Sequence, residues 1–178
     1  KKILFPSYAC SALRHAIAMV NGKEKLIDIS PNSPNISMSG INDNSHDLSI
    51  IPHMYGIPIN FENESTPVIE DCCQALGAKV NNQFVGLKGD ISIFSFYVTK
   101  LMTSGGQGGM LVSKNKKYVD AARDYREFDL RNDNKKRFNF QMTDFQAALG
   151  LSQLDRLSGF IAKRLSCSGR YESALGEK

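Results

Sequence analysis

The chain has 178 residues, of which 42% are hydrophobic and 22% are charged, and its formal net charge is +4. These values are typical of a soluble globular protein with one well-developed core. No run approaches the ~20 apolar residues of a membrane span, and the basic residues form no sustained stripe of the kind that binds nucleic acid. We therefore expect neither a membrane nor a nucleic acid as a partner.

Neither a secretion signal nor a metal centre is expected. Lys1 and Lys2 lead directly into a short strand-like run, without the apolar segment of a signal peptide. The four cysteines, at positions 10, 72, 73 and 167, lack the spacing of a zinc site. Adjacent Cys72 and Cys73 suit small packing residues better than a disulfide framework. We therefore expect reduced thiols, no metal and a cytoplasmic location.

The first half of the chain alternates short apolar runs with one helical pattern and polar loops. Strands are predicted at 3–7, 25–29, 48–52 and 67–71, loops at 30–47 and 57–66, and a short helix at 72–78. The spacing of Leu13, Ile17 and Val20 predicts a helix over 9–21. Asn21-Gly22 then ends this helix in the manner of a C-cap.

The second half is predicted to contain strands at 91–96 and 109–113, a polar helix over 114–128 and a charged loop over 129–139. Thr143 and Gln146 form the pattern of a capping box, so a long helix begins after Thr143, and Ser158-Gly159 is predicted to divide it. Within the charged loop, Lys135-Lys136-Arg137 is interpreted as a solvated turn, with a phosphate contact as the alternative.

Helices that alternate with short, continuously apolar strands indicate an α/β fold with a largely parallel sheet. In such sheets ligands bind at the carboxyl ends of the strands. Three predicted strands end in residues that can take part in chemistry: His53, Asp71 and Lys100. Of these, His53 is interpreted as structural.

Lys100 follows an apolar strand and precedes a glycine-dense turn. Alone, it fits a tuned amine for Schiff-base chemistry and a solvated surface lysine equally well. Asp71 makes the first interpretation more specific. Pyridoxal 5'-phosphate (PLP) needs a lysine to form an imine with its aldehyde and a carboxylate to keep its pyridine nitrogen protonated. The pair is moderately specific, since many α/β proteins carry an aspartate and a lysine at strand ends.

Longer strings carry a stronger signal. They are Pro6-Ser-Tyr-Ala-Cys10, His53-Met-Tyr-Gly56, Val68-Ile-Glu-Asp-Cys-Cys-Gln-Ala-Leu-Gly-Ala78, Gly89-Asp-Ile-Ser-Ile-Phe-Ser-Phe-Tyr-Val-Thr-Lys100, Gly108-Gly-Met110 and Phe138-Asn-Phe-Gln-Met-Thr-Asp-Phe-Gln-Ala-Ala-Leu-Gly-Leu-Ser-Gln-Leu154. Together they closely resemble the DegT/DnrJ/EryC1/StrS family of PLP-dependent sugar aminotransferases, from about Ile3 to about Tyr171. The resemblance implies a three-layer αβα core with a mostly parallel mixed sheet, as in the large domain of a fold type I aminotransferase.

The resemblance also implies a role for each matching residue. By it, Lys100 is the catalytic lysine that bonds to PLP and moves the proton, and Asp71 pairs with the pyridine nitrogen. Gln74 faces the ring near its phenolic oxygen, and Ser95 binds the phosphate. Asn139 reaches the phosphate bound by the other subunit of a homodimer. Without the resemblance, Gln74, Ser95 and Asn139 would each be interpreted as ordinary structural residues.

The family pattern extends beyond this sequence at both ends. Members carry a preceding phosphate-binding loop at a helix N-terminus and a C-terminal small domain. Residues 1–157 are therefore expected to form a partial PLP-binding large domain, and residues 158–178 the helix that would lead into the small domain. Cys10 stands where many members carry an aromatic residue against the cofactor ring, and Gln141 replaces a frequent arginine or lysine.

The function implied by the resemblance is transfer of an amino group, from glutamate, to a nucleotide-linked keto-sugar. Such reactions supply cell-surface polysaccharides or secondary-metabolite sugars. The alternative is a truncated, catalytically impaired relative that acts as a binding module or has no activity. A dehydratase variant of the family is disfavoured, because such members lose the lysine that is present here as Lys100.

Overall fold

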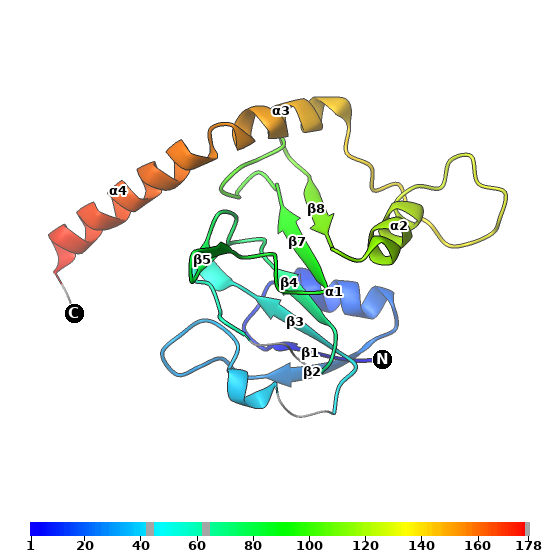
Figure 1. Cartoon of the computed structure of the whole chain (residues 1–178), viewed down its shortest axis with the longest axis horizontal. Helices are drawn as coiled ribbons and strands as arrows, with labels where there is room; N and C mark the ends of the chain where they lie inside the picture. Colours follow the sequence, from blue (N-terminus) through cyan, green and yellow to red (C-terminus); the bar gives the residue numbers. More distant parts are fainter. Residues whose placement is uncertain (42–44, 62–64, 177–178) are drawn as a thin grey trace. The chain divides into compact units, whose positions relative to one another are not determined.

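The computed structural model describes residues 1–41, 45–61 and 65–176. These residues form two compact units, which we describe separately. Unit 1 comprises Lys1–Ser95 and Met110–Gln141, and unit 2 comprises Phe96–Gly109 and Met142–Lys178. Figure 1 labels the helices and strands of both units.

Unit 1 is built on a six-stranded sheet with the order β2-β1-β3-β4-β7-β8 (Figure 1). Its strands are β1 (Lys2–Pro6), β2 (Lys23–Ile27), β3 (Leu48–Pro52), β4 (Val68–Asp71), β7 (Ile91–Ser95) and β8 (Gly109–Val112). The pairs β1–β2, β1–β3, β3–β4 and β4–β7 are parallel, whereas β8 runs opposite to β7 (Figure 1). The mostly parallel mixed sheet predicted from the sequence is confirmed.

Unit 1 also contains two α-helices and several shorter elements. They are α1 (Ser11–Met19), α2 (Lys116–Tyr125), the short 3-10 helices η1 (Met38–Gly40) and η2 (Met54–Gly56), and the antiparallel pair β5 (Lys79–Val80) and β6 (Gln83–Phe84). Strand β2 begins before the predicted strand at 25–29, because it pairs with β1 from Lys23 onward.

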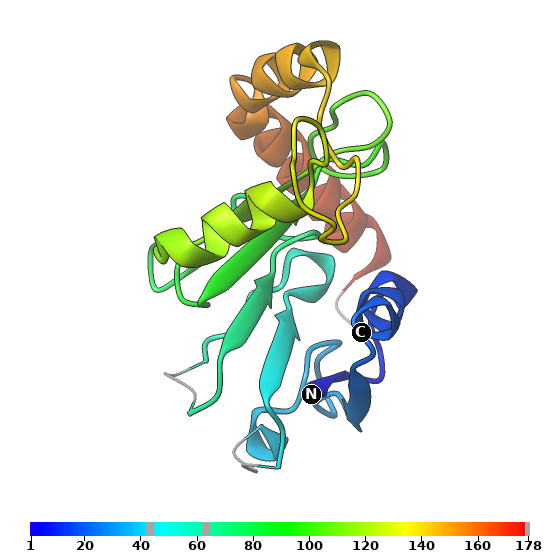
Figure 2. The same ribbon diagram turned by 90° about the vertical axis from the view of Figure 1, so that its right-hand side faces the viewer.

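Side chains on both faces of the sheet are buried around β1 and β3. On one face, Phe5 and Ile50 pack with Leu13 and Ile17 of α1, which Figure 2 shows beside β1 and β2. The opposite face is covered by the segments that follow β2 and β3. The buried residues on that face are Leu4, Ile36, Ile41, Ile51, Ile59, Phe61 and Val68. The side chains of successive strand residues thus point alternately to the two faces of the sheet.

Helix α1 ends as the sequence predicts. Asn21 has a φ of 53°, and the N–H groups of Asn21 and Gly22 donate to the carbonyls of Ala18 (3.0 Å) and Ile17 (2.9 Å). This is the Schellman arrangement, with asparagine in the left-handed position. A Cβ at Gly22 would lie 2.8 Å from Ile3 Cδ1, so a side chain at this position would force the Ile3 side chain to shift.

Unit 2 contains the loop 96–109 and the helices α3 (Asp144–Leu154) and α4 (Leu157–Leu175). The Gln146 N–H donates to Thr143 Oγ1 (3.3 Å), and the Thr143 N–H donates to Gln146 Oε1 (3.0 Å), which confirms the predicted capping box. The break between the helices falls just before the predicted one, at Asp155 and Arg156. Within the part of the chain that the structure describes, no helix combines the length and apolar character needed to cross a membrane.

The helix predicted over 72–78 is wrong. This segment forms turns instead, with a hydrogen bond from the Ala75 N–H to the Cys72 carbonyl (3.0 Å). The Cys73 N–H donates to Asp71 Oδ1 (3.0 Å). This bond forms a side-chain turn at the start of the segment, and Gly77, with a φ of 84°, lies outside helical geometry, so the chain does not continue as a helix.

Candidate functional site

The carboxyl ends of β1, β3, β4 and β7 lie at one edge of the sheet in unit 1, because neighbouring strands in this set are parallel. Cys10 follows β1, Tyr55 follows β3, Asp71 ends β4 and Ser95 ends β7. In the β4–β7 register Asp71 lies opposite Ile93. The topology therefore brings several of the predicted site residues to the edge where ligands of α/β sheets bind.

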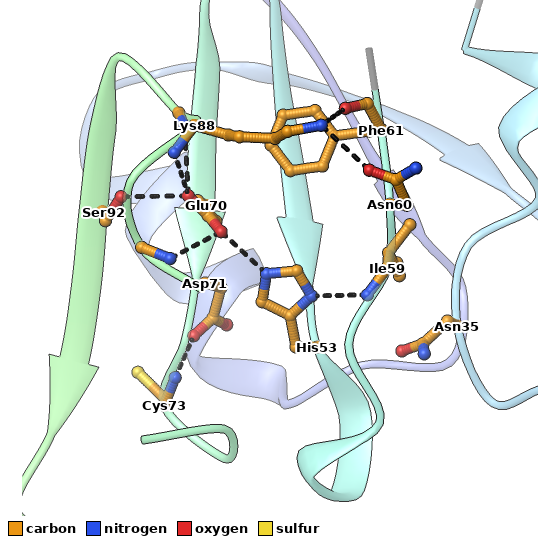
Figure 3. A network of polar contacts seen from close by, with 12 residues as sticks. Asn35, His53, Ile59, Asn60, Phe61, Glu70, Asp71, Cys73, Lys88 and Ser92 are labelled. Atoms are coloured by element: carbon orange, nitrogen blue, oxygen red, sulfur yellow. Dashed lines mark hydrogen bonds and ion pairs between the residues drawn. The ribbon is translucent and has the colours of Figure 1, made fainter. Parts of the chain in front are cut away.

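Asp71 is a buried carboxylate at this edge, with 8% of its surface exposed. Its Oδ1 accepts the Cys73 N–H (3.0 Å), as Figure 3 shows. No other hydrogen bond to the Asp71 carboxylate is present among residues 1–41, 45–61 and 65–176. A carboxylate can accept several hydrogen bonds, so Oδ2 remains available to a donor such as a protonated ring nitrogen.

Gln74 lies three residues beyond Asp71, with an exposed side chain. Its Oε1 accepts the backbone N–H of Tyr55 (2.8 Å), and its Nε2 lies 3.9 Å from Met54 Sδ. The hydroxyl groups of Tyr55 and Tyr8 are hydrogen-bonded to each other. Hydrogen bonds therefore link Tyr8, Tyr55 and Gln74, which follow β1, β3 and β4, in one row.

The other predicted site residues of unit 1 occupy accessible or half-buried positions. Cys10 is exposed and immediately precedes α1, and Ser95 is half-buried at the end of β7. Asn139 is exposed in an extended segment beside the end of α2, where the Phe138 N–H donates to the Tyr125 carbonyl (2.9 Å). The ligand contacts of these three residues remain predictions.

Glu70, the neighbour of Asp71, is the acceptor at the centre of a buried polar network (Figure 3). Its side chain is only 2% exposed. The donors to its carboxylate are His53 Nε2 (3.0 Å), the Ser92 hydroxyl (3.3 Å), and the backbone N–H groups of Gly86 (2.6 Å), Lys88 (3.2 Å) and Gly89 (3.0 Å). The Glu70 network thereby ties β3, β7 and the loop before β7 to the strand that carries Asp71.

The proton on His53 can be placed from its two partners. Its Nδ1 accepts the Ile59 N–H (3.0 Å), so the proton is on Nε2, which donates to Glu70 Oε1 (3.0 Å). Burial raises the pKa of Glu70, but the His53 bond and the N–H bonds of Gly86 and Gly89 outweigh it and lower the pKa to about 2. Glu70 is therefore ionised at neutral pH, and His53 has the structural role that the sequence predicts.

One group of potential metal ligands lies in the same region, where ligand atoms of His53, Glu70 and Cys72 are within 4.8 Å of one another. Both nitrogens of His53 and both oxygens of Glu70 are occupied by hydrogen bonds within the protein. Burial raises the pKa of the Cys72 thiol, and the charges of Glu70 and Asp71 add to this effect. The group is therefore part of the packing around Asp71 and not a preformed metal site.

Lys100 lies in unit 2, in a loop that folds back on itself. The Phe96 N–H donates to the Gly108 carbonyl (2.8 Å), and the Lys100 N–H closes a turn onto the Tyr97 carbonyl (2.9 Å). The Lys100 side chain is half-buried. In the described ranges of the chain, its Nζ forms no ion pair or hydrogen bond. The amine is thus not paired with a carboxylate of the described residues.

Ser104 is the buried centre of the lysine loop, with 1% of its surface exposed. Its N–H donates to the Phe96 carbonyl (3.0 Å), and its hydroxyl donates to the Gln107 carbonyl (2.8 Å). A Cβ at Gly108 would lie 2.0 Å from Ser104 Oγ, so the loop closes only with glycine there. Gln146 Nε2 also donates to the Gln107 carbonyl (3.1 Å), which attaches the loop to α3.

Sequence reasoning missed the Glu70 network and the turn at Tyr55. An acidic residue inside the apolar run Val68-Ile-Glu-Asp71 was a visible signal of a buried acceptor, because a charge is buried only when it is paired. The Tyr55-Gly56 pair was a weaker signal of an unusual turn. Neither signal identifies the hydrogen-bond partners of Glu70 or of the Tyr55 turn, because these partners come from segments distant in the sequence.

The sheet order and its parallel strands define an α/β protein of the kind formed by fold type I aminotransferases. The structure of Helicobacter pylori PseC, an aminotransferase involved in the biosynthesis of pseudoaminic acid, matches with a TM-score of 0.89 at 20% identity, covering 99% of this chain and 52% of that chain. Spr1654 from Streptococcus pneumoniae, in its PLP form, matches with a TM-score of 0.83 at 20% identity, covering 97% of this chain and 53% of that one.

The sequence itself defines the family. The model of the DegT/DnrJ/EryC1/StrS aminotransferase family matches residues 1–178, so the chain belongs to this family. GDP-perosamine synthase of Escherichia coli O157:H7 is 28% identical over 189 residues, which cover 98% of this chain and 52% of that protein. The chain thus spans about half the length of this relative.

Proposed function

We propose that this chain is the core of a PLP-dependent aminotransferase that transfers an amino group from glutamate to a nucleotide-linked keto-sugar. Support comes from membership of an aminotransferase family and from relatives named GDP-perosamine synthase and UDP-N-acetyl-3-dehydro-alpha-D-glucosamine 3-aminotransferase. The Spr1654 neighbour was solved with PLP. The observation that carries the proposal is the Asp71 carboxylate, which is buried at the carboxyl edge of the sheet with Oδ2 left for a ligand.

The residues present fit this cofactor. A buried carboxylate that accepts one hydrogen bond from the part of the chain that the structure describes suits a protonated pyridine nitrogen, which would supply a second, charge-assisted bond. A half-buried lysine amine that pairs with no carboxylate among residues 1–41, 45–61 and 65–176 suits a cofactor aldehyde. When bound, PLP supplies the electron sink that allows an amino group to be moved between carbon atoms.

In this proposal each candidate site residue has a defined role. Asp71 keeps the ring nitrogen protonated, and Lys100 bonds to the cofactor and then carries the proton as general acid and base. Ser95 donates to the cofactor phosphate, and Cys10 packs on the ring where other members place an aromatic side chain. Gln74 contacts the phenolic oxygen.

The proposal extends to the assembly. The enzyme is a homodimer in the cytoplasm, in which Asn139 of one subunit reaches the phosphate held by the other. Residues 1–157 form part of the PLP-binding large domain, and residues 158–178 lead toward a small domain that closes over the substrate. The product then enters the synthesis of a cell-surface polysaccharide or of a secondary-metabolite sugar.

The test is to titrate the 178-residue chain with PLP and follow the visible absorbance band that arises when a lysine amine bonds to the aldehyde. We expect a saturable band for the wild type and none for Lys100→Ala. Lys116→Ala is the matched control, because Lys116 is an exposed lysine on α2 paired with Asp120. Equal bands in the wild type and Lys100→Ala would show that Lys100 does not bond to the cofactor.

A further inference from the structure

The turn after β3 holds a tyrosine in a backbone conformation that tyrosine rarely adopts. Tyr55 has a φ of 56° and a ψ of 19°. This is the left-handed region, where a Cβ crowds the neighbouring carbonyl and where bulky residues are outliers. Such conformations persist only where the surroundings fix them, and they concentrate at functional sites.

The surroundings of Tyr55 do fix it. Asn35, which is 4% exposed, braces the turn from both ends, because its Oδ1 accepts the Met54 N–H (2.8 Å) and its Nδ2 donates to the Ile57 carbonyl (2.9 Å). The Ile57 N–H closes the turn onto the Met54 carbonyl (2.9 Å). The side chain is held separately by the hydroxyl of Tyr8. These bonds together hold Tyr55 in its left-handed conformation.

The consequence of this conformation is the direction of the Tyr55 N–H, which donates to Gln74 Oε1 (2.8 Å). Only the oxygen of an amide can accept this proton, so the bond identifies which end of the Gln74 amide faces Tyr55. The Nε2 group, with two N–H donors, is left with a weak contact to Met54 Sδ at 3.9 Å. Gln74 therefore presents a donor from an exposed side chain three residues beyond Asp71.

We propose that Tyr55 is a positioning residue, whose backbone N–H fixes the Gln74 amide so that Nε2 donates to the bound cofactor. This inference rests on the proposed function, because the acceptor beside a pyridine ring bound at Asp71 is the phenolic oxygen of PLP. If Lys100 bonds to PLP, the linking nitrogen would donate to the same oxygen when it is protonated. A hydrogen bond from Gln74 Nε2 to this oxygen would weaken the bond from the linking nitrogen and so lower the pKa of that nitrogen.

The experiment compares two substitutions at one position. Tyr55→Asn and Tyr55→Val both remove the phenol, but asparagine tolerates the left-handed region and β-branched valine does not. The readout is the pH midpoint at which the visible band of the PLP-loaded chain changes to its unprotonated form. We expect the wild type and Tyr55→Asn to share one midpoint. Tyr55→Val should raise it by about one pH unit, as should Gln74→Leu, which lacks the donor.

Two results would overturn the inference: a Tyr55→Val midpoint equal to that of the wild type, or equal shifts in both Tyr55 variants. Gln74→Leu changes an exposed side chain and keeps the test decisive if Tyr55→Val does not fold. A wild-type chain that forms no band refutes the proposed function instead. The positioning is then tested by amide hydrogen exchange without cofactor. The Tyr55 N–H should be protected in the wild type and exchange at least tenfold faster in Gln74→Leu, and equal rates would refute the positioning.

Discussion

The Glu70 network makes a sharp prediction about stability. Replacing Glu70 with glutamine keeps the shape of the side chain but removes its charge and turns an NH2 group toward backbone N–H donors. The pKa of Glu70 is lowered from 4.5 to about 2 in the folded chain. At about 1.4 kcal/mol per pKa unit, the ionised form contributes about 3 kcal/mol to the free energy of unfolding at neutral pH. Glu70→Gln should lose about this amount.

The pH dependence follows from the sign of the shift. Because the pKa is lower in the folded state, this contribution is complete above the unfolded pKa of 4.5 and is lost as the pH falls toward 2. The difference in stability between the wild type and Glu70→Gln should therefore shrink from about 3 kcal/mol at pH 7 toward zero near pH 2. Comparing the two chains at each pH removes the contributions of other carboxylates.

Urea unfolding followed by far-ultraviolet circular dichroism measures this difference, since the chain contains no tryptophan to report by fluorescence. Asp120→Asn is the control, because Asp120 pairs with Lys116 on the exposed surface of α2. The Asp120→Asn substitution should change the free energy of unfolding by less than about 0.5 kcal/mol. A Glu70→Gln chain as stable as this control, or a difference that does not vary with pH, would show that the ionised Glu70 does not stabilise the fold.

Three further substitutions test the capping box, the lysine loop and the cofactor partner. Thr143→Ala should lower the free energy of unfolding by about 1 kcal/mol in the same urea assay, because it removes the cap of α3. Gly108→Ala should abolish the PLP absorbance band and expose the loop 96–109 to limited proteolysis, because its methyl group would lie 2.0 Å from Ser104 Oγ. Asp71→Asn should keep the band but slow its change on addition of glutamate by roughly 100-fold or more, measured by stopped-flow absorbance.

Each of these expectations has a clear contrary result. Unchanged unfolding of Thr143→Ala would mean that the cap does not stabilise α3. A Gly108→Ala chain that binds PLP normally would mean that the loop closes with a side chain at this position. An Asp71→Asn chain that reacts with glutamate at the wild-type rate would remove Asp71 from the proposed mechanism.

Local patterns were sufficient to predict much of the fold. Strand β3 lies at the predicted residues 48–52, and the helix beginning after Thr143 has its predicted cap, because both depend on neighbours in the sequence. The turns at 72–78 could not be predicted in the same way. That segment is shaped by the Asp71 carboxylate and by packing of the buried Cys72 and Ala75 against Val85, which are properties of the assembled structure.

Chemistry restricts the residue types that a PLP site needs, and Asp71 and Lys100 are named from the sequence on that ground. The structure places Asp71 at the end of β4 and Lys100 in the loop after β7, and their roles toward the cofactor stay predictions. The left-handed turn at Tyr55 could not be predicted, because it depends on the Asn35 side chain from a distant loop. The donor end of Gln74 likewise becomes visible only once the partner of its oxygen is known.

In the proposed function, Lys100 bonds covalently to PLP. Borohydride reduction of the PLP-loaded chain would fix that bond, and peptide mass spectrometry would then locate it. We expect one stoichiometric pyridoxyl modification on the peptide that contains Lys100, and none in Lys100→Ala. A label spread over several surface lysines, or none on Lys100, would contradict this expectation.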